Sequence, residues 1–107
     1  MKTPEQKRAA KQEKRTAQTY GGRETIMSGQ GWKQKHDVRS DEFLIENKTR
    51  HSGFKSYSVD GTLMRDLTLR ARMEGRTPLL QFDMMNRRYV VLNEDDFLEI
   101  LEQRDDT

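Results

Sequence analysis

The sequence predicts a fold of the α/β class with a mixed α+β sheet, its elements running in the order α-β-β-β-β-α-β-β-α. Two observations lead to this prediction. Leu63, Leu67 and Ala71 recur every four residues, which is the spacing of one face of an amphipathic helix. Before and after that helix lie short segments rich in β-branched and aromatic residues, bounded by glycine, asparagine, aspartate and serine, as is typical of strands. Helices interleaved with strands indicate helices packed in layers on a sheet.

The first predicted element is a helix over residues 4–19. Pro4 suits a first helical turn, and alanine, the best helix former, occurs three times along the segment. Hardly any large apolar side chain lies on this helix, so we expect residues 1–12 to act as a basic, partly flexible arm. Gly21 can adopt the left-handed conformation that commonly ends a helix.

Four short strands are expected between this helix and the amphipathic one. They are placed at residues 23–27, 37–39, 42–49 and 54–59, and a basic, glycine-containing loop over residues 28–36 separates the first two. The last of the four, Phe-Lys-Ser-Tyr-Ser-Val, alternates apolar and polar residues in the pattern of a strand.

The second half of the chain predicts a helix, a hairpin and a final helix. Asp60 is a candidate N-cap for the helix over residues 61–74, and Gly75 ends that helix. The remaining elements are strands at residues 77–83 and 87–92 joined by a turn at Met85-Asn86, and a helix over residues 94–103 capped by Asn93.

The composition describes one small, highly charged domain. Its 107 residues are 32% hydrophobic and 36% charged, and the mean hydropathy is −1.09. We expect a single domain over residues 13–103 and an acidic tail over residues 104–107. The absence of cysteine excludes disulfides and zinc–thiolate sites. With no secretory signal and no apolar run near the roughly 20 residues of a membrane helix, we expect a cytoplasmic protein without a membrane partner.

Charge is distributed unevenly along the chain. Residues 1–23 carry seven basic and two acidic side chains, whereas residues 94–107 carry seven acidic side chains and one basic. A basic arm and a basic middle suit a polyanionic partner. The alternative is solvated charge on a soluble protein, which composition alone favours.

One predicted strand breaks its apolar pattern where it ends. In FLIENKT, residues 43–49, three apolar residues are followed by Glu46 and Lys48, two positions apart. Side chains two positions apart point to one face of a strand, so we expect these two to lie together. If this strand forms a hairpin with the preceding one, Asp37 comes close to Glu46, and two carboxylates converge beside one ammonium group.

Two carboxylates beside a lysine suit the hydrolysis of a phosphodiester. Mg²⁺ prefers oxygen ligands, typically one or two carboxylates with water and substrate phosphate completing its shell. A bound metal lowers the pKa of its water and polarises the phosphoryl oxygen, while Lys48 can offset developing negative charge. The alternative is a cross-strand salt bridge without catalytic role, because this pattern arises easily by chance in a charged chain.

An ordered series of motifs surrounds this strand: GGRETIMSGQGWKQKHDVRSDEFLIENKT, then FKSYSV, then GRTPLL. Over residues 13–83 the series resembles the PD-(D/E)xK nuclease superfamily, particularly its branch of small Holliday-junction-resolvase-like and phage endonucleases. The resemblance implies a restriction-endonuclease-like core and a Mg²⁺-dependent endodeoxyribonuclease, with Mn²⁺ as a possible substitute. It also implies a homodimer that cuts DNA, with a preference for branched DNA such as four-way junctions, in a bacterial or phage-infected cell.

The resemblance assigns roles to individual residues. Asp37 and Glu46 look like the metal-binding carboxylates, and the backbone carbonyl of Asn47 looks like a third ligand. Lys48 looks like the catalytic lysine. Glu13 is similar to the acid of the first helix that completes the metal site or orients its water in many members.

The expected DNA-binding residues lie mainly in and around the basic loop. Ser28 matches the loop serine of the family, Lys55 resembles a basic residue of its fourth strand, and Trp32 could stack on an exposed base. The full set is Arg23, Ser28, Gly29, Trp32, Lys33, Lys35 and Lys55. The alternative for Trp32 is a lid folded back on the core.

Some features of the sequence leave alternatives open. His36 stands where the family often has glycine, and Asn47 stands on a strand face that should be apolar, so its side chain lacks an explanation. The arginines on or after the second helix, Arg65, Arg70, Arg72 and Arg76, suit phosphate contacts or a solvated helix face equally well. For the whole chain, the rivals are a non-catalytic DNA-binding protein on the same fold, and a nicking or duplex endonuclease without junction preference.

Overall fold

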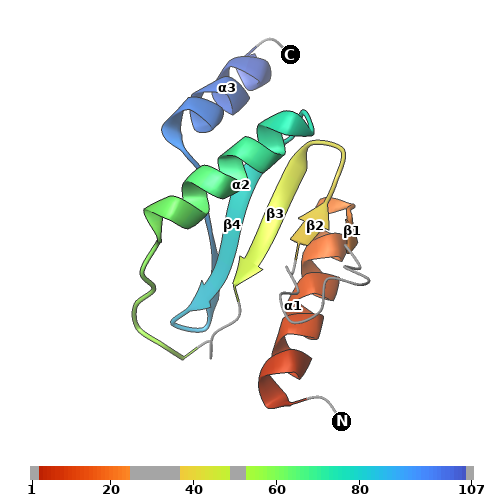
Figure 1. The fold of residues 1–107 in the computed structure, drawn as a ribbon, viewed down its shortest axis with the longest axis vertical. Helices are drawn as coiled ribbons and strands as arrows, with labels where there is room; N and C mark the ends of the chain where they lie inside the picture. The colour runs from red at the N-terminus through yellow and green to blue at the C-terminus, as the bar shows by residue number, and fades with distance from the viewer. Residues whose placement is uncertain (1–2, 25–36, 49–52, 106–107) are drawn as a thin grey trace.

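The computed structural model of the chain describes residues 3–24, 37–48 and 53–105 (Figure 1). These residues form a mixed α+β fold with three helices and a five-stranded sheet. The helices are α1 (Pro4–Tyr20), α2 (Gly61–Met73) and α3 (Glu94–Asp105). The strands are β1 (Arg23–Glu24), β2 (Asp37–Arg39), β3 (Phe43–Lys48), β4 (Thr77–Met84) and β5 (Arg87–Val91). None of the helices in the described ranges is long and apolar enough to cross a membrane.

The five strands are ordered β1-β2-β3-β4-β5 across the sheet. The first three form an antiparallel meander, and β4 and β5 form an antiparallel hairpin. Only the central pair, β3 and β4, is parallel, because α2 carries the chain back between them. The sheet is therefore mixed, as the sequence predicts.

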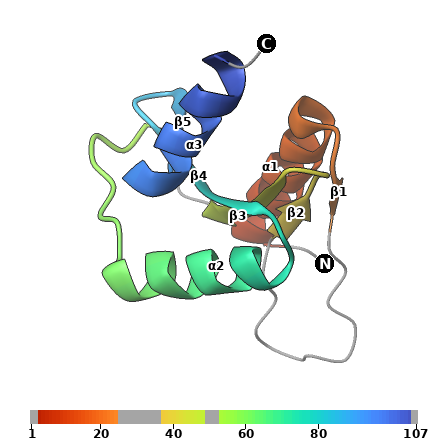
Figure 2. The ribbon, with the colours of Figure 1, turned by 90° about the horizontal axis from the view of Figure 1, so that it is seen from above.

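The two longer helices cover opposite faces of this sheet (Figure 2). The α2 face buries one cluster made of Leu44, Leu67, Ala71, Leu80 and Phe82. The α1 face buries a second cluster made of Val38, Ile45 and Leu79, against which Ala17, Tyr20 and Phe43 pack. Leu44 and Ile45 are neighbours in the chain but belong to different clusters, which is the alternation expected of a strand covered on both sides.

α1 starts with a capping box. Thr3 Oγ1 accepts a hydrogen bond from the backbone N–H of Gln6, and Gln6 Oε1 accepts one from the backbone N–H of Thr3. The helix ends at Gly21, whose φ of 67° is left-handed, as expected. It runs without a break from residue 4 to residue 20 and buries Ala9, so the expected arm and the expected domain share one helix.

The predicted caps and turns of the second half are confirmed. Asp60 Oδ1 accepts a hydrogen bond from the backbone N–H of Thr62 at the start of α2, and Asn93 Oδ1 accepts one from the backbone N–H of Asp96 at the start of α3. Met85 and Asn86 have φ of 50° and 59°, the left-handed pair that joins β4 to β5 in a tight hairpin.

The prediction of a strand over residues 54–59 is wrong. This segment is irregular and mostly exposed, and it leads from the end of β3 to the start of α2. It cannot pair beside β3, because β2 and β4 already occupy both edges of that strand. Its alternating pattern serves a different contact: the Tyr57 ring stacks on Phe82 with the ring centroids 4.1 Å apart. The observed order is therefore α-β-β-β-α-β-β-α.

Candidate active site

The structure brings the two candidate carboxylates side by side. Asp37 of β2 and Glu46 of β3 are direct partners in the antiparallel register, as the sequence predicts. Both lie on the α2 face, and their exposed fractions are only 2% and 7%. Buried carboxylates need a cation or hydrogen-bond donors to offset the loss of water.

Lys48 is placed beside this pair at the end of β3. Its Nζ lies 3.4 Å from Oε2 of Glu46, and its side chain is 41% exposed. The predicted sharing of one strand face by Glu46 and Lys48 is therefore confirmed. Lys48 therefore lies between the buried acids and the solvent, from which a substrate phosphate can approach.

A second basic residue, Arg70 of α2, lies between the two acids. Its Nη1 donates to Oδ2 of Asp37 at 2.7 Å, and its Nη2 donates to Oε1 of Glu46 at 2.6 Å. The planar guanidinium fork thus binds one carboxylate with each arm, a geometry that lysine cannot reproduce. The two acids and two bases of this cluster have formal charges that cancel.

Two buried atoms of the cluster are left without a hydrogen bond. These are Oδ1 of Asp37 and Nε of Arg70, which have no partner among the described residues. A buried carboxylate oxygen without a donor is unfavourable. A cation bound at this oxygen would offset that cost.

The carboxylate oxygens present here fit a hard divalent cation that takes only one or two of its ligands from protein side chains. The described ranges contain no group of three or more acidic or histidine side chains that could enclose a metal ion. Asp37 and Glu46 nevertheless supply the one or two carboxylates that Mg²⁺ usually takes from a protein, with water and phosphate completing the shell. The free Oδ1 of Asp37 supports this fit.

A buried polar layer supports the same strand from the opposite face. Asn47, whose side chain the sequence left unexplained, directs its amide toward α1, where Thr16 Oγ1 lies 2.8 Å from Asn47 Oδ1. Gln12 Nε2 donates to the backbone carbonyl of Lys48 at 3.1 Å and contacts the Gln81 side chain. These contacts fix the backbone on which Glu46 and Lys48 stand.

The other predicted site residues lie at different distances from the carboxylates. Glu13 is half-buried on α1, the helix on the opposite face of the sheet from the side chains of Asp37 and Glu46. Arg23 lies on β1 opposite Arg39, two residues along β2 from Asp37. The loop residues Ser28, Gly29, Trp32, Lys33, Lys35 and His36 fall outside the described ranges.

Lys55 lies at the same end of the sheet as Lys48. The backbone carbonyl of Phe54 accepts a hydrogen bond from the N–H of Met85 in the β4–β5 turn at 2.8 Å. Because β3 and β4 are parallel, with Lys48 opposite Phe82, this turn lies beyond the end of β3. Lys55 is exposed there, outside the strand that was predicted for it.

An ion-pair cluster of Arg39, Glu74 and Arg76, here called the clamp, holds the end of β2 that lies away from Asp37 against α2. Arg39 donates from Nε and Nη2 to the two carboxylate oxygens of Glu74 at 2.7 and 2.9 Å, and Arg76 donates to the same carboxylate at 2.7 Å. The hydrogen bond from Arg39 holds the pKa of Glu74 below its ordinary value, and the pKa of Arg39 is raised in return, mainly by the same bond. The clamp ties β2, which carries Asp37, to the end of the helix that carries Arg70.

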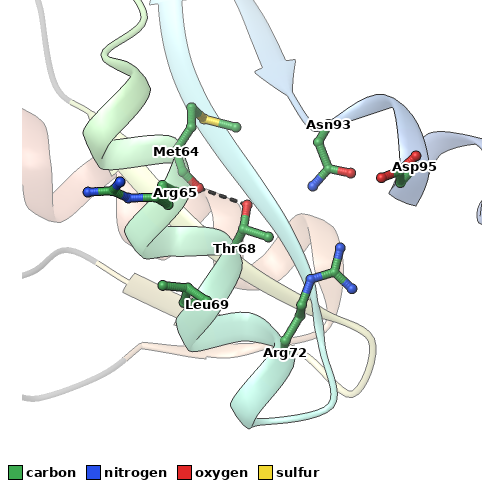
Figure 3. Close-up of a pocket in the computed structure, with 7 residues that line it drawn as sticks. All are labelled: Met64, Arg65, Thr68, Leu69, Arg72, Asn93 and Asp95. Atoms are coloured by element: carbon green, nitrogen blue, oxygen red, sulfur yellow. Dashed lines mark hydrogen bonds between the residues drawn. The ribbon is translucent and has the colours of Figure 1, made fainter.

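A pocket with a volume of about 290 Å³ lies on another side of α2, and Figure 3 shows the residues that line it. It is lined by Met64, Arg65, Thr68, Leu69, Arg72, Asn93 and Asp95. None of the four residues of the carboxylate cluster lines it. Arg72 reaches across it toward the start of α3, with Nη2 4.0 Å from Oδ2 of Asp96. The pocket and the carboxylate cluster are therefore separate features.

The sequence did not predict that Arg70 and the polar layer belong to the site. Arg70 follows Leu67 by three residues and Leu63 by seven, so it lies on the inward stripe of α2, where a charge requires a buried partner. By contrast, the buried face of α1, formed by Ala9, Gln12 and Thr16, is mostly polar, so no apolar periodicity marks it in the sequence. Only the signal for Arg70 is present in the sequence.

No protein-family model, curated protein or solved structure matches this chain significantly. We therefore infer the function of the site from its geometry alone. Two buried carboxylates are paired across β2 and β3, and Lys48 and Arg70 are the cations beside them.

Proposed function

We propose that this chain is a metal-dependent endonuclease that hydrolyses DNA phosphodiester bonds, with Mg²⁺ as its ordinary metal and Mn²⁺ as a substitute. The observation that carries the proposal is the direct pairing of Asp37 with Glu46, with Lys48 on the same strand face. A chance salt bridge needs only one acid and one base. Here two acids lie together in a buried position, and one oxygen of Asp37 has no hydrogen-bond donor among the described residues.

Three residues of the cluster have direct roles in the proposed reaction. Asp37 and Glu46 hold the metal, and the backbone carbonyl of Asn47 is a third ligand in the proposal. When bound, the metal supplies an activated water and polarises the phosphoryl oxygen. The ammonium group of Lys48 offsets the negative charge that develops on the phosphate. Water adds to phosphorus, one P–O ester bond breaks, and the departing oxygen takes a proton.

The fold is compatible with a restriction-endonuclease-like core, which is part of the proposal. A mixed sheet covered by α1 and α2 presents the acids near its centre, on strands rather than on loops. Sites built on strands hold their side chains more firmly than sites built on loops. Glu13 is left out of this proposal, because α1 lies on the opposite face of the sheet from the side chains of Asp37 and Glu46.

DNA contact is assigned to the basic surface around the acids. Arg23 and Lys55 are exposed, and Lys55 lies at the end of the sheet where β3 ends. The loop residues Ser28, Gly29, Trp32, Lys33 and Lys35 complete the proposed DNA-binding set. Branched DNA, such as a four-way junction, is the proposed preferred substrate, and a duplex or nicking endonuclease is the variant without that preference.

A homodimer is the proposed assembly, because it would present two sites to one branched substrate. The supporting observation is that several apolar side chains of β5 and α3 are between 36% and 48% exposed, namely Tyr89, Val90, Phe97, Leu98 and Leu101. In addition, α3 is acidic and β5 carries the basic pair Arg87 and Arg88, so these elements of two copies offer opposite charges.

One observation favours a second candidate, a non-catalytic DNA-binding protein on the same fold. Arg70 already binds both carboxylates, as it would in a purely structural ion-pair cluster. In that case the basic surface binds DNA by salt-sensitive phosphate contacts. Metal-dependent cleavage distinguishes the two candidates.

The deciding experiment is a cleavage panel with single-stranded, duplex, flap and four-way-junction DNA, with and without Mg²⁺. The full chain should cut only with the metal, and most efficiently on the junction. Glu46→Gln, Asp37→Asn and Lys48→Met should each reduce cleavage by at least a hundredfold, while DNA binding in an electrophoretic shift assay stays within about threefold.

The matched control for Glu46→Gln is Glu42→Gln, because Glu42 is an exposed acid immediately before β3. That variant should cut like the unchanged chain. Full cleavage by Glu46→Gln in Mg²⁺ would reject the site assignment. DNA binding without cleavage of any substrate would favour the non-catalytic candidate.

A further inference from the structure

Arg70 occupies the place between the carboxylates that a metal ion would take. It binds Oδ2 of Asp37 and Oε1 of Glu46, one with each terminal nitrogen, at 2.7 and 2.6 Å. These oxygens belong to the two side chains that the proposed function assigns to the metal. A guanidinium and a divalent cation cannot both lie between them.

We propose that Arg70 is an internal counter-cation that competes with the divalent metal for Asp37 and Glu46, so that metal binding requires Arg70 to leave. The inference rests on the proposed metal site and adds a control on its occupancy. Arg70 keeps the metal-free chain folded with two buried acids, and it lowers the affinity of the site for metal in the absence of DNA.

Charge explains why the two cations exclude each other. With Arg70 and Lys48 in place, the formal charges of the four side chains cancel. A divalent ion that entered this neutral cluster would gain little attraction and would lie within a few ångströms of the guanidinium. If Arg70 is absent or displaced, the two acids and Lys48 leave one net negative charge, which attracts the ion.

The contacts of Arg70 are compatible with its displacement. Its side chain is 25% exposed, so it lies at the border of the cluster rather than deep in the core. Its Nε has no hydrogen-bond partner among the described residues, and the terminal nitrogens make the two ionic contacts. Oδ1 of Asp37 is likewise buried without a hydrogen-bond partner among the described residues.

The two arms of the fork bind residues that are not neighbours in the sequence. Asp37 and Glu46 are 33 and 24 residues away from Arg70, on two different strands. Because Arg70 bridges these two residues, removal of its guanidinium leaves two buried acids facing each other across β2 and β3. A metal ion that bridges them should restore the stability that this substitution removes.

The test is a titration of the full chain with MgCl₂ or MnCl₂ in the absence of DNA, monitored by isothermal titration calorimetry. Arg70→Gln should bind either metal at least tenfold more tightly than the unchanged chain. The matched control is Arg72→Gln, two residues further on the same helix, whose side chain is 55% exposed. It should leave the affinity within twofold. Equal or weaker binding by Arg70→Gln would overturn the proposal.

Thermal melting provides a second measurement on the same proteins. Without metal, Arg70→Gln should melt at a lower temperature than the unchanged chain. Addition of 10 mM MgCl₂ should raise the melting temperature of the variant more than that of the unchanged chain. A shift of the same size in both would contradict the competition.

A conservative variant keeps the test decisive if Arg70→Gln does not fold. Arg70→Lys retains a positive charge but cannot bind both acids with one planar fork. Because a single ammonium group holds the two acids less firmly than the fork does, it is displaced more easily, and this variant should bind Mn²⁺ more tightly than the unchanged chain. Unchanged or weaker binding by this variant would speak against the proposal. The double variant Arg70→Gln/Glu46→Gln should lose the gain in affinity, which locates the metal at the carboxylates.

These measurements separate the inference from the proposed function, because they contain no DNA. If Arg70→Gln binds metal more tightly but the unchanged chain never cleaves DNA, the nuclease proposal fails and the role of Arg70 stands. If neither the unchanged chain nor Arg70→Gln binds metal, the role of Arg70 is rejected, whatever the cleavage assay shows.

Discussion

Thr16 of α1 contacts Asn47 of β3, with Oγ1 of the threonine 2.8 Å from Oδ1 of the amide. Asn47 stands between Glu46 and Lys48 but points to the opposite face, where only 3% of it is exposed. The same hydroxyl lies 2.8 Å from the backbone carbonyl of Gln12. Since a hydroxyl has one proton, it serves one of these two acceptors at a time. The contact explains how a polar side chain fits under α1.

Thr16→Val should lower stability, because it keeps the shape of the side chain and removes the hydroxyl from a buried amide. The expected loss is about 1–3 kcal/mol in the free energy of unfolding, measured by urea denaturation. Thr19→Val is the control, because Thr19 is exposed on the same helix. A loss no greater than that of the control would show that Asn47 does not depend on the hydroxyl.

Leu67→Ala should be among the most destabilising changes in α2. Leu67 is fully buried against Leu44, Leu80 and Phe82, so truncation leaves a cavity as well as losing apolar contact. The expected cost is about 2–5 kcal/mol in the free energy of unfolding. Leu69→Ala is the comparison, since Leu69 is 55% exposed on the same helix, and it should cost about 0.5 kcal/mol or less. Equal effects would mean that α2 is not docked on this face.

Gly22→Ala should disturb the junction between α1 and β1. A Cβ at Gly22 would lie 2.6 Å from the backbone carbonyl oxygen of Arg39 on β2, closer than real Cβ atoms approach. Backbone must shift to accept it, at a cost of about 1–3 kcal/mol in chemical denaturation. Gly61→Ala, with no heavy atom within 4 Å of the added Cβ, should be neutral or slightly stabilising. The opposite ranking would be incompatible with the packing of β2 against Gly22.

The clamp of Arg39 and Glu74 predicts a pH-dependent contribution to stability. Because Arg39 lowers the pKa of Glu74 in the folded protein, the stabilisation is present above the unfolded pKa and is lost as the pH falls through the folded one. Glu74→Gln should cost about 0.5–1 kcal/mol near pH 7, allowing for solvent screening of a partly exposed pair. The gap between the variant and the unchanged chain should close as the pH falls below about 4.3.

Urea denaturation at several pH values between 7 and 3 measures this effect. Glu42→Gln serves as the control, because Glu42 is an exposed acid. A difference between Glu74→Gln and the unchanged chain that stays constant over the whole range would contradict the assignment of the lowered pKa to the clamp.

The proposed homodimer predicts a change of mass when exposed apolar side chains of α3 are altered. Phe97→Ser and Leu101→Ser remove two of them and should convert a dimer to a monomer in size-exclusion chromatography with light scattering. Met73→Ser is the control, because Met73 is 88% exposed and lies on α2. A monomeric mass for the unchanged chain would reject the dimer.

Much of the local structure could be predicted from short-range signals. The caps at Asp60 and Asn93, the turn at Met85 and Asn86, and the end of α1 at Gly21 all follow from residues within one turn of each other. The pairing of Asp37 with Glu46 followed from a short hairpin, whose register is set by few residues.

The predictions that failed depended on tertiary contacts, which cannot be read from any short segment of the sequence. Residues 54–59 alternate like a strand, but β3 had no free edge to receive them. α1 had no large apolar stripe, but Gln12 and Thr16 dock it through hydrogen bonds to polar groups of β3 and β4. A polar docking face has no periodic apolar pattern from which it can be read.

The sequence by itself determined where the elements lie and that two acids and a lysine meet on one strand face, because alternation and turn chemistry are local. Only the tertiary structure decided which cation lies between Asp37 and Glu46. Arg70 reaches them from a helix 24 and 33 residues away, and its inward direction depends on how α2 packs across β3 and β4. The spacing of Arg70 from Leu67 shows that it points inward, but only the packed sheet supplies the two carboxylates that it binds.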